Sequence, residues 1–205
     1  NKVVIAYRDD GNSYYGTAIV GTVSGTSISF GSAAVYHSTN AIANMIAFDS
    51  TNNKVVIAYK DNSDSSKGKA VVGTVSGTSI SFGSPAVFEE GGIVTSGNTG
   101  IGIVYDSNAE KIVIHYEDSG DSNYSKLIVG TVSGTSISFA GELTTYAGNT
   151  TYQNAIFDST NNRVVLVMNN FAKVYSNAED LSGSLSHDAV TAGTALSATK
   201  LLVKG

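Results

Sequence analysis

The sequence predicts an all-β fold, a β-propeller-like array of four-stranded antiparallel blades of about 52 residues each. The first observation is a ten-residue string, GTVSGTSISF, that occurs three times without change, beginning at Gly21, Gly73 and Gly130. The second is a composition rich in Val, Ile, Thr, Ser, Tyr and Gly with a single proline, which is typical of strands and tight turns. The third is a segment in each repeat that is apolar on both faces and must therefore be covered on both sides.

Each repeat unit divides into four predicted strands, and the second copy illustrates them in order. The first is the apolar run that ends at Phe48, and the second is Lys54–Tyr59, after a Ser-Thr-Asn-Asn turn. The third runs through Ala70–Val75 and the fourth through Ser79–Phe88, after a Ser-Gly-Thr turn. Short strands separated by Gly, Asn and Ser are typical of hairpins rather than helices.

The second strand of each repeat is the feature that indicates stacked blades. Its alternate residues are apolar on both sides, so we expect Val56 and Ile57, which point in opposite directions, both to be buried. His115 stands in the third copy where the second copy has Ala58, which indicates packing between blades rather than catalysis. A single sheet with one solvent-exposed face would not have apolar residues on both faces of this strand.

Four copies can be aligned on the second strand, and their extent sets the predicted domains. Residues 1–176 hold three clear copies and a degenerate fourth, and residues 177–205 form a C-terminal tail or capping segment with a strand-like Lys200–Val203. Asn1 aligns with the middle of a repeat, so we expect the chain to be part of a longer protein. A β-solenoid and a β-sandwich are the alternatives, although solenoid coils are usually shorter and a sandwich does not require identical repeats.

Composition and charge exclude several classes of function. The net charge is −5 with only 14% charged residues and no basic stripe, which argues against nucleic acid as a partner. No apolar stretch reaches the roughly 18 residues that a membrane-spanning helix needs. Cysteine is absent, so disulfides and thiolate metal sites are excluded. Arg8 and Arg163 are the only arginines, which excludes the three-arginine cluster of propeller sialidases.

The loops after the second strand differ between the copies, whereas the other turns hardly vary. In an up-and-down blade these loops emerge on the same face as the connections between blades, one of which carries five extra residues. Variable loops rich in Tyr, Ser, Gly and Asn above an invariant scaffold indicate a recognition surface, although unconstrained drift would also explain the variation. The candidate binding residues on this face are Asp10, Asn12, Tyr14, Tyr15, Asp64, Lys67, Glu89, Glu90, Asp121, Asn123 and Tyr124.

Metal binding and catalysis have weaker signals. Asp9, Asp61 and Asp118 open the variable loops and are candidate Ca²⁺ ligands, with two or three suitable oxygens in each loop. The full spacing of a dedicated calcium loop is absent, and turn formation by Asp accounts for the same residues. Glu89 and Glu90 are adjacent and would face opposite sides of a strand, whereas glycoside hydrolysis needs two carboxylates at a fixed separation. We therefore expect no cofactor and no enzymatic activity, with a polysaccharide depolymerase as the alternative.

The repeats resemble a known group of proteins. The pattern FDSTNNKVVIAYKD followed by GKAVVGTVSGTSISFGSPAVF looks like the repeat arrays of structural and tail-appendage proteins of marine tailed phages, including cyanophages. The ending AGTALSATKLLVKG is similar to the C-terminal ending of such proteins. The resemblance covers about 170 residues of repeats and the last 14 residues. It implies a virion component, such as a fibre, spike or decorating appendage, and it transfers no catalytic residues.

These observations lead to one expected function and two rivals. We expect a non-enzymatic adhesion module on a phage particle, whose loops recognise a host-surface glycan or protein. Its expected partners are other virion subunits, with homo-oligomers, and several shallow sites on one scaffold would bind by avidity. The rivals are a purely structural protein of virion assembly and a secreted bacterial lectin or surface protein of similar build.

Overall fold

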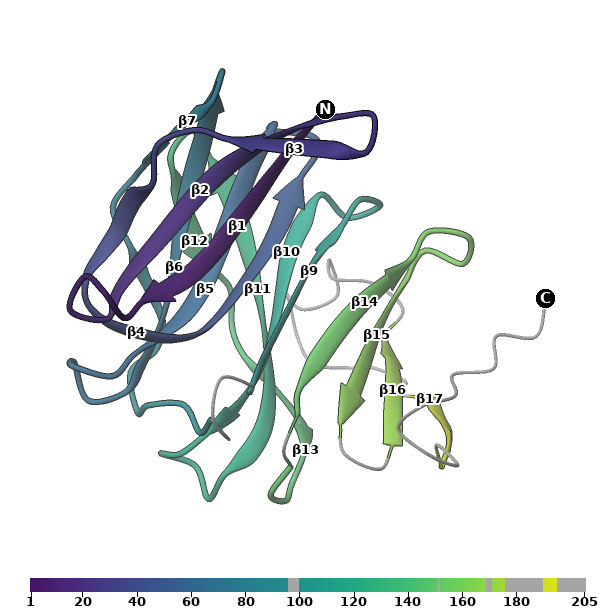
Figure 1. Cartoon of the computed structure of the whole chain (residues 1–205). Helices are drawn as coiled ribbons and strands as arrows, with labels where there is room; N and C mark the ends of the chain where they lie inside the picture. The colour runs from purple at the N-terminus through teal and green to yellow at the C-terminus, as the bar shows by residue number, and fades with distance from the viewer. Residues whose placement is uncertain (96–99, 151, 169–170, 176–189, 195–205) are drawn as a thin grey trace.

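The computed structural model of the chain describes residues 1–95, 100–150, 152–168, 171–175 and 190–194. Every regular element in these ranges is a β-strand, so the all-β prediction is confirmed. The strands pair antiparallel throughout the described residues and form three sheets, of eight, five and four strands (Figure 1). The expected strand Lys200–Val203 lies outside the described residues.

Strand pairing divides the chain into four units that follow the sequence repeat. Unit 1 contains β1 (Lys2–Asp9), β2 (Tyr15–Ser24), β3 (Ser27–Phe30) and the first half of β4 (Ala34–Asp49). Unit 2 contains the second half of β4, β5 (Lys54–Asp61), β6 (Lys67–Ser76), β7 (Ser79–Phe82) and β8 (Ala86–Glu89). Unit 3 contains β9 (Ile101–Asp106), β10 (Lys111–Asp118), β11 (Tyr124–Ser133), β12 (Ser136–Phe139) and β13 (Leu143–Tyr146). Unit 4 contains β14 (Asn154–Asp158), β15 (Arg163–Met168), β16 (Phe171–Tyr175) and β17 (Val190–Thr194).

The outer edge of each full repeat differs from the prediction. The single strand expected over Ser79–Phe88 is wrong, because β7 and β8 pair separately with the two halves of β6. Between them the Gly83 N–H still bonds to the Val72 carbonyl at 3.0 Å, and Pro85 has no N–H to continue the ladder. Units 1 and 3 break at the same place without a proline. The structure thus has a short hairpin strand and a second short strand in place of one long edge strand.

Strand β4 joins units 1 and 2 without a loop. Its first half pairs with β2 and its second half with β5, and the register shifts between Ile42 and Met45. Ala43 lies within this shift with a φ of 53°, the left-handed region, and the strand changes direction there. The outer strand of one unit therefore continues directly into the inner strand of the next, as Figure 1 shows where β4 sweeps beneath β1, β2 and β5.

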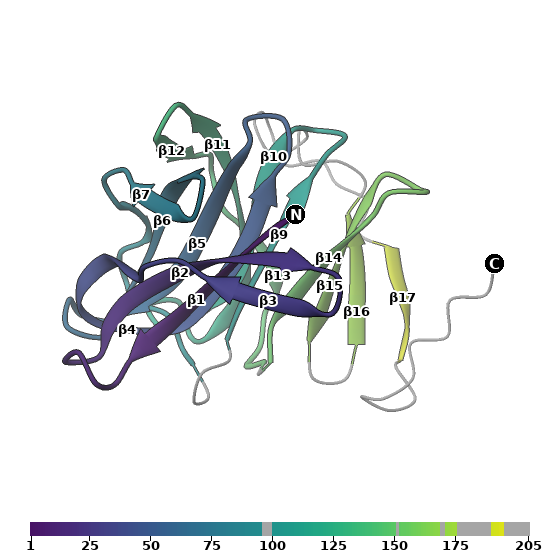
Figure 2. The ribbon, with the colours of Figure 1, turned by 45° about the horizontal axis from the view of Figure 1, so that its top comes forward.

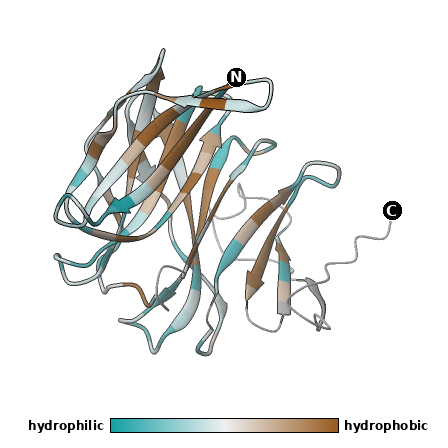
Figure 3. Cartoon of the chain, viewed as in Figure 1, coloured by the Kyte–Doolittle hydropathy of each residue, from teal (hydrophilic) through white to brown (hydrophobic). Residues whose placement is uncertain are grey.

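Neighbouring units pack face to face through their apolar side chains. Val56 and Ile57 on β5 are both fully buried, which confirms that this strand is covered on both sides. Ile57 packs in a cluster with Ala18 and Tyr36 of unit 1, whereas Val56 packs in a cluster with Ile114 of unit 3. The same stacking continues from unit 3 to unit 4. Figure 2 shows the units succeeding one another in chain order, and Figure 3 shows hydrophobic residues along the central strands.

A glycine contact repeats at two of the three junctions. A Cβ on Gly31 would overlap with the Thr78 carbonyl oxygen of unit 2, and a Cβ on Gly83 would overlap with the Thr135 carbonyl oxygen of unit 3. The next copy has Ala140 at this position, and the sequence after it contains no Ser-Gly-Thr. Glycine thus stands at this position in the two copies whose following unit has the Ser-Gly-Thr turn.

This contact gives a first testable prediction. Gly83→Ala should lower the free energy of unfolding by about 1–3 kcal/mol, since backbone of unit 3 must shift to admit the methyl group. Gly141→Ala is the matched control, because a Cβ there meets nothing within 4 Å. Urea denaturation of both variants measures the difference. Equal stability of the two variants would contradict close contact between the units at Gly83.

Candidate functional site

The three loops that follow the second strands share one backbone geometry despite their different sequences. Each contains two consecutive residues in the left-handed region: Ser13 and Tyr14, Ser65 and Ser66, and Ser122 and Asn123, all with φ between 51° and 64°. Each also closes with the same backbone bond, as in Lys67 N–H to Asp64 C=O at 3.0 Å. The backbone is therefore held constant while the side chains on it vary.

The aspartate at the head of each loop stabilises this geometry. Asp9, Asp61 and Asp118 each accept, through Oδ1, the backbone N–H two residues further on, at 3.1, 3.0 and 2.7 Å. This is the Asx turn that such residues favour. The three residues predicted as weak calcium candidates thus have a role in folding the loops.

The connections between units reach the same end of the molecule as these loops. Ile93 N–H donates to the Ser66 carbonyl at 2.9 Å, and Ser119 N–H donates to the Gly92 carbonyl at 3.0 Å. Further along, Thr150 N–H donates to the buried Glu117 carboxylate at 3.1 Å. We call the surface formed by residues 9–15, 61–67, 89–95, 118–124, 147–150 and 152–153 the loop face.

An ion-pair cluster lies beneath the loop face at the junction of units 1 and 2. Lys69 Nζ lies 2.8 Å from Asp61 Oδ2 and 2.7 Å from Asp64 Oδ2. His37 Nε2, from unit 1, lies 2.9 Å from the same Asp61 oxygen. Burial alone would raise the pKa of Asp61, but the hydrogen bonds from Lys69 and the Ser63 N–H and the nearby positive charge lower it below its ordinary value. Burial lowers the pKa of His37, against the opposing charge of Asp61.

An equivalent cluster lies at the junction of units 2 and 3. Lys126 Nζ lies 2.6 Å from Asp121 Oδ2, 2.8 Å from Glu142 Oε1 and 3.8 Å from Asp118 Oδ2. The hydroxyl of Tyr116 lies 2.7 Å from Glu142 and 3.2 Å from Glu89. Burial favours the neutral form of Lys126, but its ion pairs outweigh this effect and raise its pKa.

The second cluster is also the one group of acidic side chains, within the described residues, whose spacing suits a metal ion. Oxygens of Glu89, Asp118 and Glu142 lie within 4.8 Å of one another. The ammonium group of Lys126 contacts Glu142 and faces Asp118, and the pKa of Glu89 is raised by burial and by the charges of the other two carboxylates. The negative charge is therefore already balanced in part by lysine. Calcium binding by Asp9, Asp61 or Asp118 stays a prediction.

The predicted binding residues separate into an outward and a half-buried group. Tyr14 is 48% exposed, with the Arg8 guanidinium 4.9 Å from its ring centre, and Arg8 also pairs with Asp10 at 2.7 Å. The outward group also includes Asn12 and Glu90. The half-buried group comprises Asp64, Lys67, Glu89, Asp121, Asn123, Tyr15 and Tyr124. Lys67 pairs with the exposed Glu90 at 3.0 Å.

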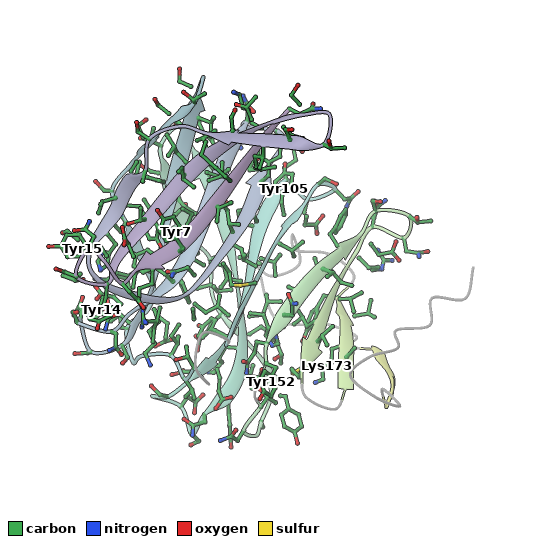
Figure 4. All side chains as sticks on the ribbon, viewed as in Figure 1. Tyr7, Tyr14, Tyr15, Tyr105, Tyr152 and Lys173 are labelled. Atoms are coloured by element: carbon green, nitrogen blue, oxygen red, sulfur yellow. The ribbon has the colours of Figure 1, made fainter. Side chains whose placement is uncertain are left out.

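Sequence reasoning missed two features of this surface. Tyr152 is 61% exposed with a φ of 61°, so it resembles Tyr14, but it lies in the region where the repeat has degenerated. Figure 4 shows Tyr14 and Tyr15 at the left of the molecule and Tyr152 toward the bottom. The second feature is the pair Lys69 and Lys126, which occupy equivalent repeat positions and could have been found by aligning them.

Comparison with known proteins gives no family for this chain. No family model matches the sequence, and no curated protein is significantly similar to it. In the part of the chain that the structure describes, no helix is long and apolar enough to cross a membrane. The function must therefore be argued from the loop face and its geometry.

Proposed function

We propose that this protein is a non-enzymatic recognition module of a phage particle, which binds a host-surface glycan or protein through the loop face. The observation that supports this proposal is the constant backbone of three loops that carry different side chains. Exposed tyrosines add to it, because an aromatic ring provides a large contact area at a small cost in side-chain entropy. The location on a virion appendage rests on the resemblance of the repeats to phage tail proteins.

Backbone strain at the exposed tyrosines also favours recognition. Tyr14 and Tyr152 have φ values of 64° and 61°, a region that costs a bulky residue on the order of 1 kcal/mol. The position equivalent to Tyr14 is Ser66 in unit 2 and Asn123 in unit 3, and asparagine suits this region better than tyrosine. Both rings are exposed, so burial does not offset this cost, and apart from the Arg8 guanidinium over the Tyr14 ring we explain them by contact with a ligand.

The proposal extends to the finer architecture, a β-propeller-like array. Antiparallel pairing within each unit is what a blade requires, whereas a β-solenoid would pair strands of successive repeats in parallel. The inner strands β4, β9 and β14 lie in contact with one another in that order, as strands around a propeller axis do. Several similar loops on one rigid array would then act together by avidity.

A binding experiment with a matched repeat substitution tests the function. Tyr14→Asn combined with Tyr152→Asn should weaken binding to a glycan array at least about tenfold, since buried aromatic anchors dominate interfaces. Stability should be unchanged or higher, because asparagine accepts the left-handed backbone, and Asn123 stands at the position equivalent to Tyr14.

Phe30→Ala is the control, since Phe30 is 51% exposed but lies away from the loop face on β3. Equal binding by all three proteins, or no binding to any glycan or to host cell envelopes, would contradict recognition by these tyrosines.

A second candidate function has an observation of its own. Unit 1 exposes an apolar outer face whose equivalents in unit 2 are covered. Ile28 is 45% exposed whereas its equivalent Ile80 is 7% exposed. A purely structural role in particle assembly would bury an apolar face of this kind against a further packed unit.

A further inference from the structure

A buried carboxylate holds residues on both sides of Tyr152. The Thr150 N–H donates to Glu117 Oε2 at 3.1 Å, and Gln153 Nε2 donates to the same oxygen at 3.2 Å. Gln153 Nε2 also donates to the Thr150 carbonyl at 2.9 Å, so these two residues are joined to each other as well. Tyr152, which is 61% exposed, lies between them on the loop face. The chain on both sides of this tyrosine is therefore tied to Glu117 near the end of β10.

This arrangement is specific to unit 3. The residues equivalent to Glu117 are Lys60 in unit 2 and Arg8 in unit 1, so one of the three clear copies has a carboxylate here. The connection between units 2 and 3 is held through backbone instead, because the Ile93 N–H donates to the Ser66 carbonyl at 2.9 Å. Glu117 thus has a role at its junction that backbone hydrogen bonds have at the preceding one.

The polar contacts continue inward from Thr150. Its hydroxyl donates to Ser125 Oγ at 3.2 Å, and this oxygen lies 2.9 Å from His115 Nε2. The hydroxyl of Thr145 donates to the Ser125 carbonyl at 3.0 Å. All four of these residues are at most 2% exposed, and Glu117 is 1% exposed. We call these five residues the polar network.

Units 1 and 2 have apolar packing where unit 3 has the polar network. In unit 2, Gly68 stands at the position of Ser125, and the Phe88 ring lies so close that a Cβ on this glycine would overlap with it. In unit 1, Gly16 and Tyr36 form the same pair. Unit 3 has threonine in place of the ring. Since an aromatic ring on glycine fills this place in two units, the fold of a unit does not require polar side chains there.

The polar network is also costly for the folded state. Burial raises the pKa of Glu117, against the hydrogen bonds from Gln153 and the Thr150 N–H, and Glu117 Oε1 has no hydrogen-bond partner among the described residues. A buried carboxylate with neutral donors recovers only part of the hydration that it has lost. A costly arrangement that is found in one unit, and that leads to an exposed tyrosine, is explained by the position that it gives to that tyrosine.

We propose that Glu117 is a positioning residue for ligand binding, which fixes Thr150 and Gln153 and thereby holds Tyr152 in one orientation on the loop face. This inference rests on the proposed function, because it assigns Tyr152 to contact with a ligand. The advantage is preorganisation, since a side chain that is ordered before binding loses less entropy on binding. The φ of 61° at Tyr152 fits this role, because surrounding contacts must hold a bulky residue in the left-handed region.

NMR relaxation of the full chain tests the positioning without any ligand. In the parent protein we expect an order parameter of about 0.85 for the Tyr152 amide, the value of rigid backbone, and in Glu117→Leu a value below about 0.6. Hydrogen exchange at the Thr150 amide should be at least about tenfold faster in the same variant, because its acceptor is gone. Glu117→Gln should restore both values, since one side-chain oxygen can accept both hydrogen bonds.

Thr145→Val is the matched control. It removes a hydroxyl from the polar network, but this hydroxyl bonds to the Ser125 carbonyl and not to Thr150 or Gln153. The control should therefore lower the stability and leave Tyr152 ordered. Equal order of Tyr152 in the parent and in Glu117→Leu, or an equal loss of order in Glu117→Leu and in the control, would overturn the proposal. If leucine at position 117 prevents folding, Gln153→Met removes the other donor and has the same expected result.

The glycan array then connects the order of Tyr152 with binding. Glu117→Leu should weaken binding at least about tenfold, as Tyr152→Asn should, and the two together should add little because they act on one contact. Unchanged binding by a Glu117→Leu chain whose Tyr152 has lost its order would also overturn the proposal. If the parent binds nothing while Glu117→Leu still releases Tyr152, the proposed function is wrong, and the hold of Glu117 on Tyr152 is a property of the fold alone.

Discussion

Replacing Ile57 with alanine should lower the free energy of unfolding by about 2–5 kcal/mol, the range for a large-to-small change in a packed core. Ile57 is fully buried between units 1 and 2, in a cluster with Ala18, Tyr36 and Val71. The cavity left by the substitution lies between two sheets that are already packed against each other, so collapse around it is restricted. Urea denaturation at pH 7 measures the change.

The repeat provides an unusually close control for this substitution. Ile5 holds the same position in unit 1, with the same neighbours in sequence, but it is 43% exposed because no unit covers it. Ile5→Ala should therefore change the stability by less than about 1 kcal/mol. Similar losses for Ile5 and Ile57 would mean that stacking between units contributes little to the stability at this position.

Acid should destabilise the protein through His115, and this effect should be the second largest. His115 is fully buried, and burial lowers its pKa from 6.5 to about 3, against a smaller opposing effect of a backbone hydrogen bond with Asn154. Between pH 6.5 and pH 3 the unfolded chain therefore binds a proton that the folded chain does not bind. Stability is lost as the pH falls through this window, by up to about 1.4 kcal/mol for each pH unit.

A single substitution separates this effect from those of other titrating groups. His115→Ala introduces the residue that unit 2 has at the equivalent position, Ala58. The variant should have a weaker dependence of unfolding free energy on pH between 6.5 and 3 than the parent protein. Glu117 has its pKa raised by burial and so opposes the acid effect, but it is present in both proteins. An unchanged pH dependence would show that His115 remains able to take up a proton in the folded chain.

Much of the fold could be predicted because the repeat supplies its own alignment. The sequence predicts the second strand at Lys54–Tyr59, and in the structure this strand, β5, is only two residues longer, ending at Asp61. Its two apolar faces correctly indicated burial on both sides, since apolar or aromatic residues occupy every position from Val55 to Tyr59 and leave no face suited to water. The turn aspartates also behave alike, because Asp49 and Asp158 each accept backbone N–H groups of the turn that follows.

Other features could not be predicted because they depend on how one unit lies against the next. The break between β7 and β8 and the continuous β4 follow from edge pairing, which leaves no clear mark on hydrophobic periodicity. The clusters around Lys69 and Lys126 join residues from two units, so their members are distant in sequence. His37 and Glu89 occupy the same repeat position with different chemistry, and neither resembles a conserved motif when a single copy is considered.

The glycine that follows the ten-residue string has a consequence for how such a chain can grow. Gly31 contacts Thr78 and Gly83 contacts Thr135, and both threonines lie inside the ten-residue string. A duplicated unit therefore contains both residues that the contact between units needs, the glycine and the threonine. A gene encoding this array could gain or lose whole units by recombination without further adjustment at the new junction. Ala140 interrupts this rule, because a standard unit inserted after it would meet the extra methyl group. Gain or loss of whole units should therefore occur before residue 140 more readily than directly after it.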